Sequence, residues 1–284
     1  MTPPEISLVV CTRDRAPQLE RTLASLKQIR DDSPAWELVV VDNGSSDDTA
    51  AVLEEFARSF GGALHLVREE RPGLARARNT GLARASGRIV AFTDDDCYPA
   101  PDWLCRIGEC FAAEPSLGFL GGRILLHDPE DRPMTILVAE ERQDFPAGSF
   151  LEPGAVQGAN LAFRRAALAG IGGFDVRLGA GTAFACEDLD AAARVSAAGW
   201  AGAYDPRPVV YHHHGRKTDE VVRALLRSYH HGAGAYYARC LMNPRLRARY
   251  GRRWVRSWFA APRRALREMK GAMHYCLDSL TGRR

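Results

Sequence analysis

The sequence has 284 residues, of which 46% are hydrophobic and 26% charged. These proportions exclude a disordered chain and a fibrous protein. No stretch approaches the roughly 18 consecutive apolar residues of a membrane-spanning helix, and the start of the chain lacks the pattern of a signal peptide. The 7 cysteines are scattered without a CxxC pair, which favours reduced thiols over a disulfide framework. We therefore expect a cytoplasmic globular protein.

The net charge of +3 is unevenly distributed along the chain. Residues 216–284 contain 17 Lys and Arg against 4 Asp and Glu, a net charge of +13. Residues 1–215 contain 21 against 31, a net charge of −10. We expect a domain over residues 1–215 and a basic, helical extension, rich in Arg and aromatic residues, over residues 216–284.

The first part of the chain alternates short apolar runs with helix-like segments. Strands are predicted at residues 6–10, 37–42, 64–69 and 88–94, with apolar residues at helical spacing between them. Strands that are apolar throughout and are separated by helices form a parallel sheet covered on both faces. The predicted fold class is α/β, with a Rossmann-like, mostly parallel sheet.

After residue 100 the pattern is less regular. It predicts, in chain order, a helix at 101–115, a strand at 117–126, a long polar connection at 128–153, a strand leading into a helix at 156–168, a helix at 186–199 and a closing strand at 201–215. A long connection in a compact domain usually serves a site or is mobile.

Ligands bind to sheets of this kind outside the carboxyl ends of the strands. Polar residues stand at these ends, namely Thr12, Arg13, Asp42, a loop with Arg71, Arg76, Arg78 and Asn79, and the triplet Asp94, Asp95 and Asp96. We expect them to converge on one rim.

The triplet follows an apolar, β-branched run. Adjacent carboxylates near a core require a compensating cation. The first and third, Asp94 and Asp96, can point the same way, and oxygen ligands suit Mg²⁺ or Mn²⁺ together with substrate phosphates. We favour a metal site over a solvated turn, which Pro99 would also suit.

Phosphate binding has to use the metal and cationic side chains, because neither GxGxxG nor a P-loop follows the first two strands. Asp42 either accepts an N–H from a uracil or guanine base or is a plain turn residue before Asn43. The arginines after the third strand either hold phosphate or cover a solvated helix face. Arg76 is favoured because Asn79 would lie one turn away.

Two further groups carry potential catalytic chemistry. Glu187 and Asp188 open a predicted helix, where they either complement its dipole or supply a general base whose pKa is perturbed by the triplet. His212 and His214 fall on one face of the last strand. One imidazole could join the metal, although three adjacent histidines do not have zinc-site spacing.

Six segments between residues 5 and 215, taken in order, resemble the family 2 glycosyltransferases, which are nucleotide-sugar-dependent enzymes of the GT-A fold. They read SLVVCTRDR, ELVVVDNGSSDDT, RPGLARARNTGLARASGRIVAFTDDD, QGANLAFRRAALAGIGGFD, EDLDAAARVSAAGW and VVYHHHG. The resemblance implies an inverting, metal-dependent transfer of a sugar from a UDP-, GDP- or dTDP-sugar to an acceptor hydroxyl. The acceptor would be a glycan, a glycolipid or another hydroxyl-bearing molecule, in polysaccharide or glycolipid biosynthesis.

The resemblance also implies roles for individual residues. The expected donor-binding set is Thr12, Arg13, Asp42, Arg76, Asn79, Asp94, Asp95 and Asn160. The expected ligands of the Mg²⁺ or Mn²⁺ are Asp96, Asp94 and His212. Asp188 matches the catalytic base, with Glu187 beside it. Many relatives read GED where this chain has Cys186 before Glu187.

Two other classes of protein are alternatives. A nucleotidyltransferase forming a nucleotide sugar should have a Gly-rich, Lys-bearing loop after the first strand, whereas residues 11–19 contain no Gly. A non-catalytic sugar-binding relative should have lost its site, whereas the triplet, Asp188 and His212 are all present.

The extension combines Arg with Trp, Phe and Leu at near-helical spacing over residues 220–242 and 252–280. Helices that lie in a membrane interface have this composition. We favour peripheral attachment to anionic lipid at the inner face of the cell membrane over a helical layer packed on the domain. Nucleic acid is not expected as a partner, because the acidic body would repel it.

Overall fold

The computed structural model describes residues 4–30 and 32–281. The first half of the chain forms β1 (Ile6–Thr12), α1 (Ala16–Leu26), β2 (Trp36–Asp42), α2 (Thr49–Ser59), β3 (Ala63–Arg68), α3 (Leu74–Arg84), β4 (Ile89–Asp94), β5 (Cys97–Pro99), α4 (Trp103–Ala113) and β6 (Leu117–Leu126). There follow β7 (Gln143–Phe145), a 3₁₀ turn η1 (Gly158–Asn160), β8 (Leu161–Arg164), α5 (Arg165–Gly170), α6 (Glu187–Ala197), β9 (Ala201–His212), α7 (Asp219–Met242), α8 (Arg247–Ala260) and α9 (Pro262–Thr281).

One sheet with the order β3-β2-β1-β4-β8-β6-β9-β5 runs through the molecule, and β7 also pairs with β9. Strands β1 to β4, β6 and β9 run in one direction, while β8, β5 and β7 are antiparallel to their neighbours. The prediction of a mostly parallel α/β sheet is therefore confirmed.

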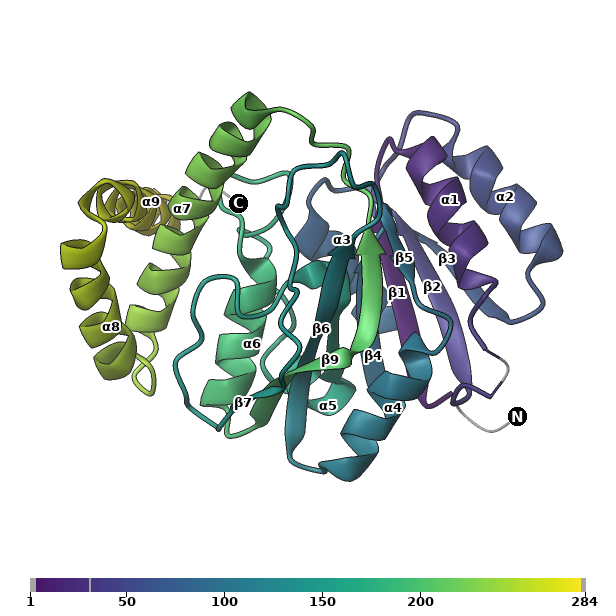
Figure 1. The fold of residues 1–284 in the computed structure, drawn as a ribbon, viewed down its shortest axis with the longest axis horizontal. Coiled ribbons are helices and arrows are strands. Elements are labelled where there is room, and N and C mark those ends of the chain that lie inside the picture. The colour runs from purple at the N-terminus through teal and green to yellow at the C-terminus, as the bar shows by residue number, and fades with distance from the viewer. Residues whose placement is uncertain (1–3, 31, 282–284) are drawn as a thin grey trace.

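Alternate residues of the central strands enter two hydrophobic cores, as strand geometry requires. Leu8 and Val10 of β1 face the core that contains residues of α1, α2 and α4. Val9 faces the core that contains residues of α3, α5, α6 and α7. Helices thus cover both faces of the sheet (Figure 1).

The parallel registers bring several strand ends to one rim. Thr12 at the end of β1 lies opposite Asp42 at the end of β2, and Cys11 lies opposite Asp94 of β4. At the other end of the strand order, Cys97 of β5 pairs with His212 at the end of β9. The registers therefore bring the ends of β1, β2 and β4 together at one edge of the sheet.

The basic extension forms three helices. Helix α7 packs against α6, and α8 and α9 pack on α7, farther from the sheet (Figure 1). The Tyr236 hydroxyl on α7 donates to the Leu151 carbonyl at 2.9 Å. Arg239 forms ion pairs of 3.1 Å with both Asp175 and Asp190. The extension is therefore a helical layer docked on the body, the alternative that the sequence analysis did not favour, whereas membrane attachment and the boundary at residue 215 stay predictions. Within the described part of the chain, no helix combines the length and the apolar character needed to cross a bilayer.

Candidate active site

The negative charge of the acidic triplet is compensated by Arg15, which directly precedes α1. Asp95 and Asp96 are 6% and 5% exposed. Arg15 places Nη2 2.6 Å from Asp96 Oδ2 and Nε 3.0 Å from Asp95 Oδ1, the latter an ion pair without hydrogen-bond geometry. The Thr12 hydroxyl donates to Asp95 Oδ2 at 2.7 Å. Asp95 and Asp96 are thus not part of a solvated turn but form a buried cluster paired with Arg15.

The two inner carboxyls differ in acidity. Burial raises the pKa of Asp95 to about 7, against the opposing effect of Arg15. Burial acts in the same direction on Asp96, but the hydrogen bond from His212 and the charge of Arg15 outweigh it and hold its pKa well below the ordinary value. Asp96 is therefore the carboxylate that stays ionised at neutral pH.

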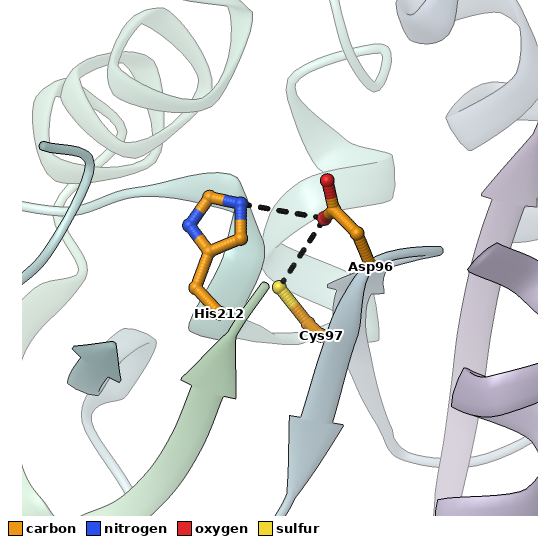
Figure 2. Close-up of side chains that lie close together, drawn as sticks. All are labelled: Asp96, Cys97 and His212. Carbon is orange, nitrogen blue, oxygen red and sulfur yellow. Dashed lines mark hydrogen bonds and ion pairs between the residues drawn. The ribbon is translucent and has the colours of Figure 1, made fainter. Parts of the chain in front are cut away.

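Asp96 lies against two other potential metal ligands, Cys97 and His212 (Figure 2). His212 Nε2 is 3.3 Å from Asp96 Oδ1, and Cys97 Sγ is 3.7 Å from the same oxygen. Two ligand atoms about 2.1 Å from one ion and at right angles are about 3 Å apart, so Asp96 and His212 are spaced to share a divalent cation. Burial raises the pKa of the Cys97 thiol, which keeps it protonated and a poor ligand for Mg²⁺ or Mn²⁺.

The second ring nitrogen of His212 supports this interpretation. Nδ1 lies 3.2 Å from the backbone oxygen of Thr135. Since only a protonated nitrogen can donate to a carbonyl, this contact assigns a proton to Nδ1. In the cationic form of the ring Nε2 also carries a proton and faces Asp96, and loss of that second proton would leave the Nε2 lone pair for a metal ion. A metal-ligating histidine is usually oriented in this way.

Asp94 does not join this group. Its Oδ1 lies 3.0 Å from Arg78 Nη2, and the other end of the same guanidinium, Nη1, lies 2.7 Å from Glu187 Oε1. The expectation that Asp94 and Asp96 point the same way is therefore not met. The physical reason is that Arg78, only 3% exposed, needs carboxylate partners on both sides.

Arg78 connects three segments of the site. It extends from α3 between the end of β4 and the start of α6, with its guanidinium 5.9 Å from the Phe92 ring centre and 5.7 Å from that of Phe174. A Cβ at Gly158 would come within 2.3 Å of Arg78 Nη2. Glycine is therefore required where the loop of η1 passes over this arginine.

Asp188 is held by two backbone N–H groups. Gly158 N donates to Oδ2 and Leu189 N donates to Oδ1, each at 2.7 Å. Burial raises the pKa of Asp188 and of its neighbour Glu187, against the opposing charge of Arg78. The two side chains form an acidic pair that is fixed in orientation and takes up a proton more readily than exposed carboxylates do.

The residue before this pair, Cys186, has φ 104° and ψ 25°. This left-handed conformation suits glycine, and a residue with a side chain is strained there by about 1–3 kcal/mol. The conformation gives a physical reason for the GED sequence of many relatives, and it identifies the Cys186 departure as a change at a strained helix start.

Of the expected donor-binding residues, Asp42 and Arg13 flank the rim. Asp42 accepts from Ser45 N at 2.8 Å and lies 2.9 Å from Arg68 Nη1, so it stabilises the turn as well as facing a cation. Arg13 is exposed, 3.5 Å from Asp14. Arg76 is half-buried, and within residues 4–30 and 32–281 its side chain has no ion pair or hydrogen bond.

Two expected donor contacts have structural partners instead. Asn79 donates to Phe174 O at 2.9 Å and accepts from Phe174 N at 2.8 Å. Asn160, 2% exposed, accepts from the Trp103 indole and donates to the backbone oxygens of Arg123 and Pro208. Both amides brace backbone, because their polar atoms are directed to main-chain and indole groups rather than to the rim.

Sequence reasoning did not select Arg15 or Cys97 as site residues, and among the arginines after the third strand it favoured Arg76 over Arg78. A signal for Arg78 exists, since Ala75 and Gly81 lie three residues to either side and small residues at that spacing mark the inner face of α3. No comparable signal marks Arg15, whose partners are 80 and 81 residues away in the chain.

Solved structures define the class of fold. A mannosyltransferase from Pyrobaculum calidifontis, PcManGT, in complex with GDP-Man and Mn²⁺, is similar with a TM-score of 0.69 and 23% identity, covering 96% of this chain and 75% of that one. S. aureus TarS 1-349 in complex with UDP-GlcNAc has a TM-score of 0.61 and 18% identity, covering 87% and 69%. The fold is GT-A, as predicted.

The sequence comparisons give the family. The pattern of "Glycosyl transferase family 2" matches residues 7–166, more than half of the chain. Glycosyltransferase AglE of Haloferax volcanii is 31% identical over 123 residues, which are 43% of this chain and 40% of that protein. The chain thus spans less than half the length of this curated relative. The protein belongs to glycosyl transferase family 2, and the predicted resemblance is confirmed.

Proposed function

We propose that the protein is a metal-dependent, inverting glycosyltransferase that moves a sugar from a nucleotide-sugar donor to an acceptor hydroxyl. The observation that carries the proposal is the pairing of Asp96 with His212 at the same rim as a backbone-held Asp188. The first pair has the atoms and spacing of a divalent-cation site. The second group has the raised pKa expected of a general base.

Asp96 and His212 would hold Mg²⁺ or Mn²⁺. Asp94 is not among the proposed ligands, because one of its oxygens is paired with Arg78 and it lies outside the group of close potential ligands formed by Asp96, Cys97 and His212. A bound divalent cation supplies charge neutralisation for the diphosphate leaving group. PcManGT, with GDP-Man and Mn²⁺ bound, is one neighbour that supports this choice of metal ion.

We assign the donor to the rim beside this pair. Asp42, at the end of β2, would accept from the base, and Thr12, Arg13 and Arg76 would line the nucleoside and phosphate pocket, next to Asp94 and Asp95. Arg15 would help to balance the carboxylates while the diphosphate enters. Both GDP-Man and UDP-GlcNAc occur in neighbours of this fold, so a guanine or a uracil donor fits the proposal.

Asp188 would act as the base. Its carboxylate takes the proton of the acceptor hydroxyl while that oxygen forms a bond to the anomeric carbon on the face opposite the diphosphate, and the bond from that carbon to the diphosphate breaks. One such displacement inverts the configuration. The N–H groups of Gly158 and Leu189 fix the carboxylate during this step.

A donor panel tests the proposal. The protein is incubated with UDP-, GDP- and dTDP-sugars and Mn²⁺, with and without EDTA, and nucleoside diphosphate release is measured. We expect release from one class of donor that stops with EDTA. Release of pyrophosphate from a nucleoside triphosphate would instead support a nucleotidyltransferase, and binding of sugar without release would support the non-catalytic alternative.

A further inference from the structure

Helix α9 is docked by an unusual face. Its buried residues are Ala265, Glu268, Gly271 and Tyr275. The Glu268 carboxylate accepts from the Trp254 indole at 2.7 Å, and the Tyr275 hydroxyl donates to Asp175 at 3.0 Å. Small and polar groups, rather than large aliphatic ones, thus hold α9 against its neighbours.

The crossing of α7 and α9 is locked by two glycines. A Cβ at Gly271 would come within 1.9 Å of the His231 backbone oxygen, and a Cβ at Gly234 would come within 1.9 Å of the Glu268 backbone oxygen. Because no side chain fits on either side, the helices touch backbone to backbone. The outward face of α9 is therefore fixed by the crossing.

That outward face is apolar. It is formed by an outer stripe, which we define as Leu266 (56% exposed), Met269 (44%), Met273 (62%), Leu277 (53%) and Leu280 (84%). These residues recur every three or four positions and so lie along one side of the helix, about 21 Å long at 1.5 Å per residue. Phe259, 84% exposed at the end of α8, continues the apolar character toward the preceding turn. An exposed apolar surface of this extent marks an interaction site.

The charges beside the outer stripe indicate what covers it. Arg263, Arg267 and Lys270 are exposed along one edge of α9. The acids of α9 are Glu268, which is buried, and Asp278, which is half-buried. A second copy of this chain would bring like charges together, whereas a layer of anionic headgroups over an apolar interior complements both the stripe and its basic edge.

We propose that α9, with the end of α8, is a docking surface for an anionic lipid bilayer, lying in its interface with the outer stripe inserted and the basic edge at the headgroups. Helices α8 and α9 lie beyond α7, on the side away from the sheet (Figure 1). The proposal does not depend on the transfer reaction, because binding to lipid is measured without donor or metal.

Cosedimentation of the full chain with vesicles tests it. Vesicles of phosphatidylcholine alone are compared with vesicles that also contain phosphatidylglycerol. We expect at least about tenfold tighter binding to the anionic vesicles, weakened by 0.5 M salt as counterions screen the charges. Leu277→Glu should weaken that binding at least tenfold, and combined Arg263→Gln, Arg267→Gln and Lys270→Gln should reduce the preference for anionic lipid.

Val138→Glu is the matched control, because Val138 is 51% exposed and lies in the connection before β7, outside the extension. It should bind vesicles like the wild type, and circular dichroism should show equal melting temperatures for all variants. Equal vesicle binding by the Leu277→Glu variant would overturn the proposal. So would a protein that ignores vesicles but forms dimers, by light scattering, that Leu277→Glu dissociates, since the stripe would then face a second copy.

Discussion

The two acidic groups of the rim are held in different ways. Asp96 faces Arg15 and His212, and these cationic partners lower its pKa. Asp188 faces the uncharged N–H groups of Gly158 and Leu189, and burial raises its pKa. Similar carboxylates therefore differ in acidity because their surroundings differ. Asp96 stays ionised and attracts a cation, while Asp188 can exchange a proton. Arg78 joins the two sides through Asp94 and Glu187.

The largest effect is expected from a substitution that removes only the proposed base, Asp188. Asp188→Asn keeps the shape and one of the two acceptor oxygens but cannot take a proton, so we expect turnover to fall about 10²- to 10⁴-fold with donor binding unchanged. Steady-state rates and calorimetric donor binding measure the two properties. Asp144→Asn, at an exposed carboxylate on β7, is the control. Near-normal turnover of Asp188→Asn would show that another group is the base.

Replacing Arg78, which pairs with both Asp94 and Glu187, should lower the free energy of unfolding. Arg78→Met leaves Asp94 and Glu187 near each other without their cation, and breaking a buried ion pair in this way costs about 3–5 kcal/mol. Urea unfolding followed by circular dichroism measures the loss. Arg78→Lys keeps the charge but not the two-ended geometry, and we expect a smaller loss. Equal stability of the Met variant and the wild type would mean that the network is not a structural link.

Substituting Asp96, the carboxylate proposed to bind the metal ion, should weaken donor binding. We expect Asp96→Ala to weaken Mn²⁺-dependent donor binding by at least about tenfold, that is 1.4 kcal/mol or more, because His212 is left without its carboxylate partner. Calorimetry with and without Mn²⁺ checks this. A variant that binds donor as tightly as the wild type, and still responds to Mn²⁺, would move the metal site elsewhere.

A change of pH tests the difference between the carboxylates without altering the sequence. Because the pKa of Asp188 is raised, its base form is lost as pH falls through a higher range than for an ordinary aspartate, and kcat/KM should fall tenfold per unit below that range.

Asp95 affects stability, and its effect runs in the opposite direction: stability should rise as pH falls. Its folded pKa of about 7 exceeds its unfolded value near 4, so metal-free protein should gain stability as pH falls from 7 toward 4 through this group. Thermal melts in EDTA and a rate profile measure the two trends, and an acidic limb near pH 4 would contradict the first.

The sheet was predictable where its strands are long and branched. Residues 6–12, 36–42 and 89–94 form the parallel core, and each ends in polar residues that the rule for strand ends selects. The three-residue β5 and the four-residue β8 run antiparallel, and such short strands have too few positions for periodicity to reveal their direction.

The site was predictable in its acids and not in its cations. Asp96, Asp188 and His212 stand next to strand ends or at a helix start, so local sequence identifies them. The pairing of Arg15 with Asp96 and of Arg78 with Glu187 joins residues far apart in the chain. Which arginine turns inward depends on the packing of α3, and the local sequence favoured Arg76, whereas the structure buries Arg78.

The glycine crossing of α7 and α9 has a consequence for how this protein can vary. A helix turns about 100° per residue, so inserting a single residue after Gly271 would rotate Met273, Leu277 and Leu280 away from Leu266 and Met269. Exchanging one aliphatic side chain for another would leave their alignment intact. We therefore expect the last helix to tolerate conservative replacements far better than changes of length, and Gly271 serves as the angular reference for everything that follows it.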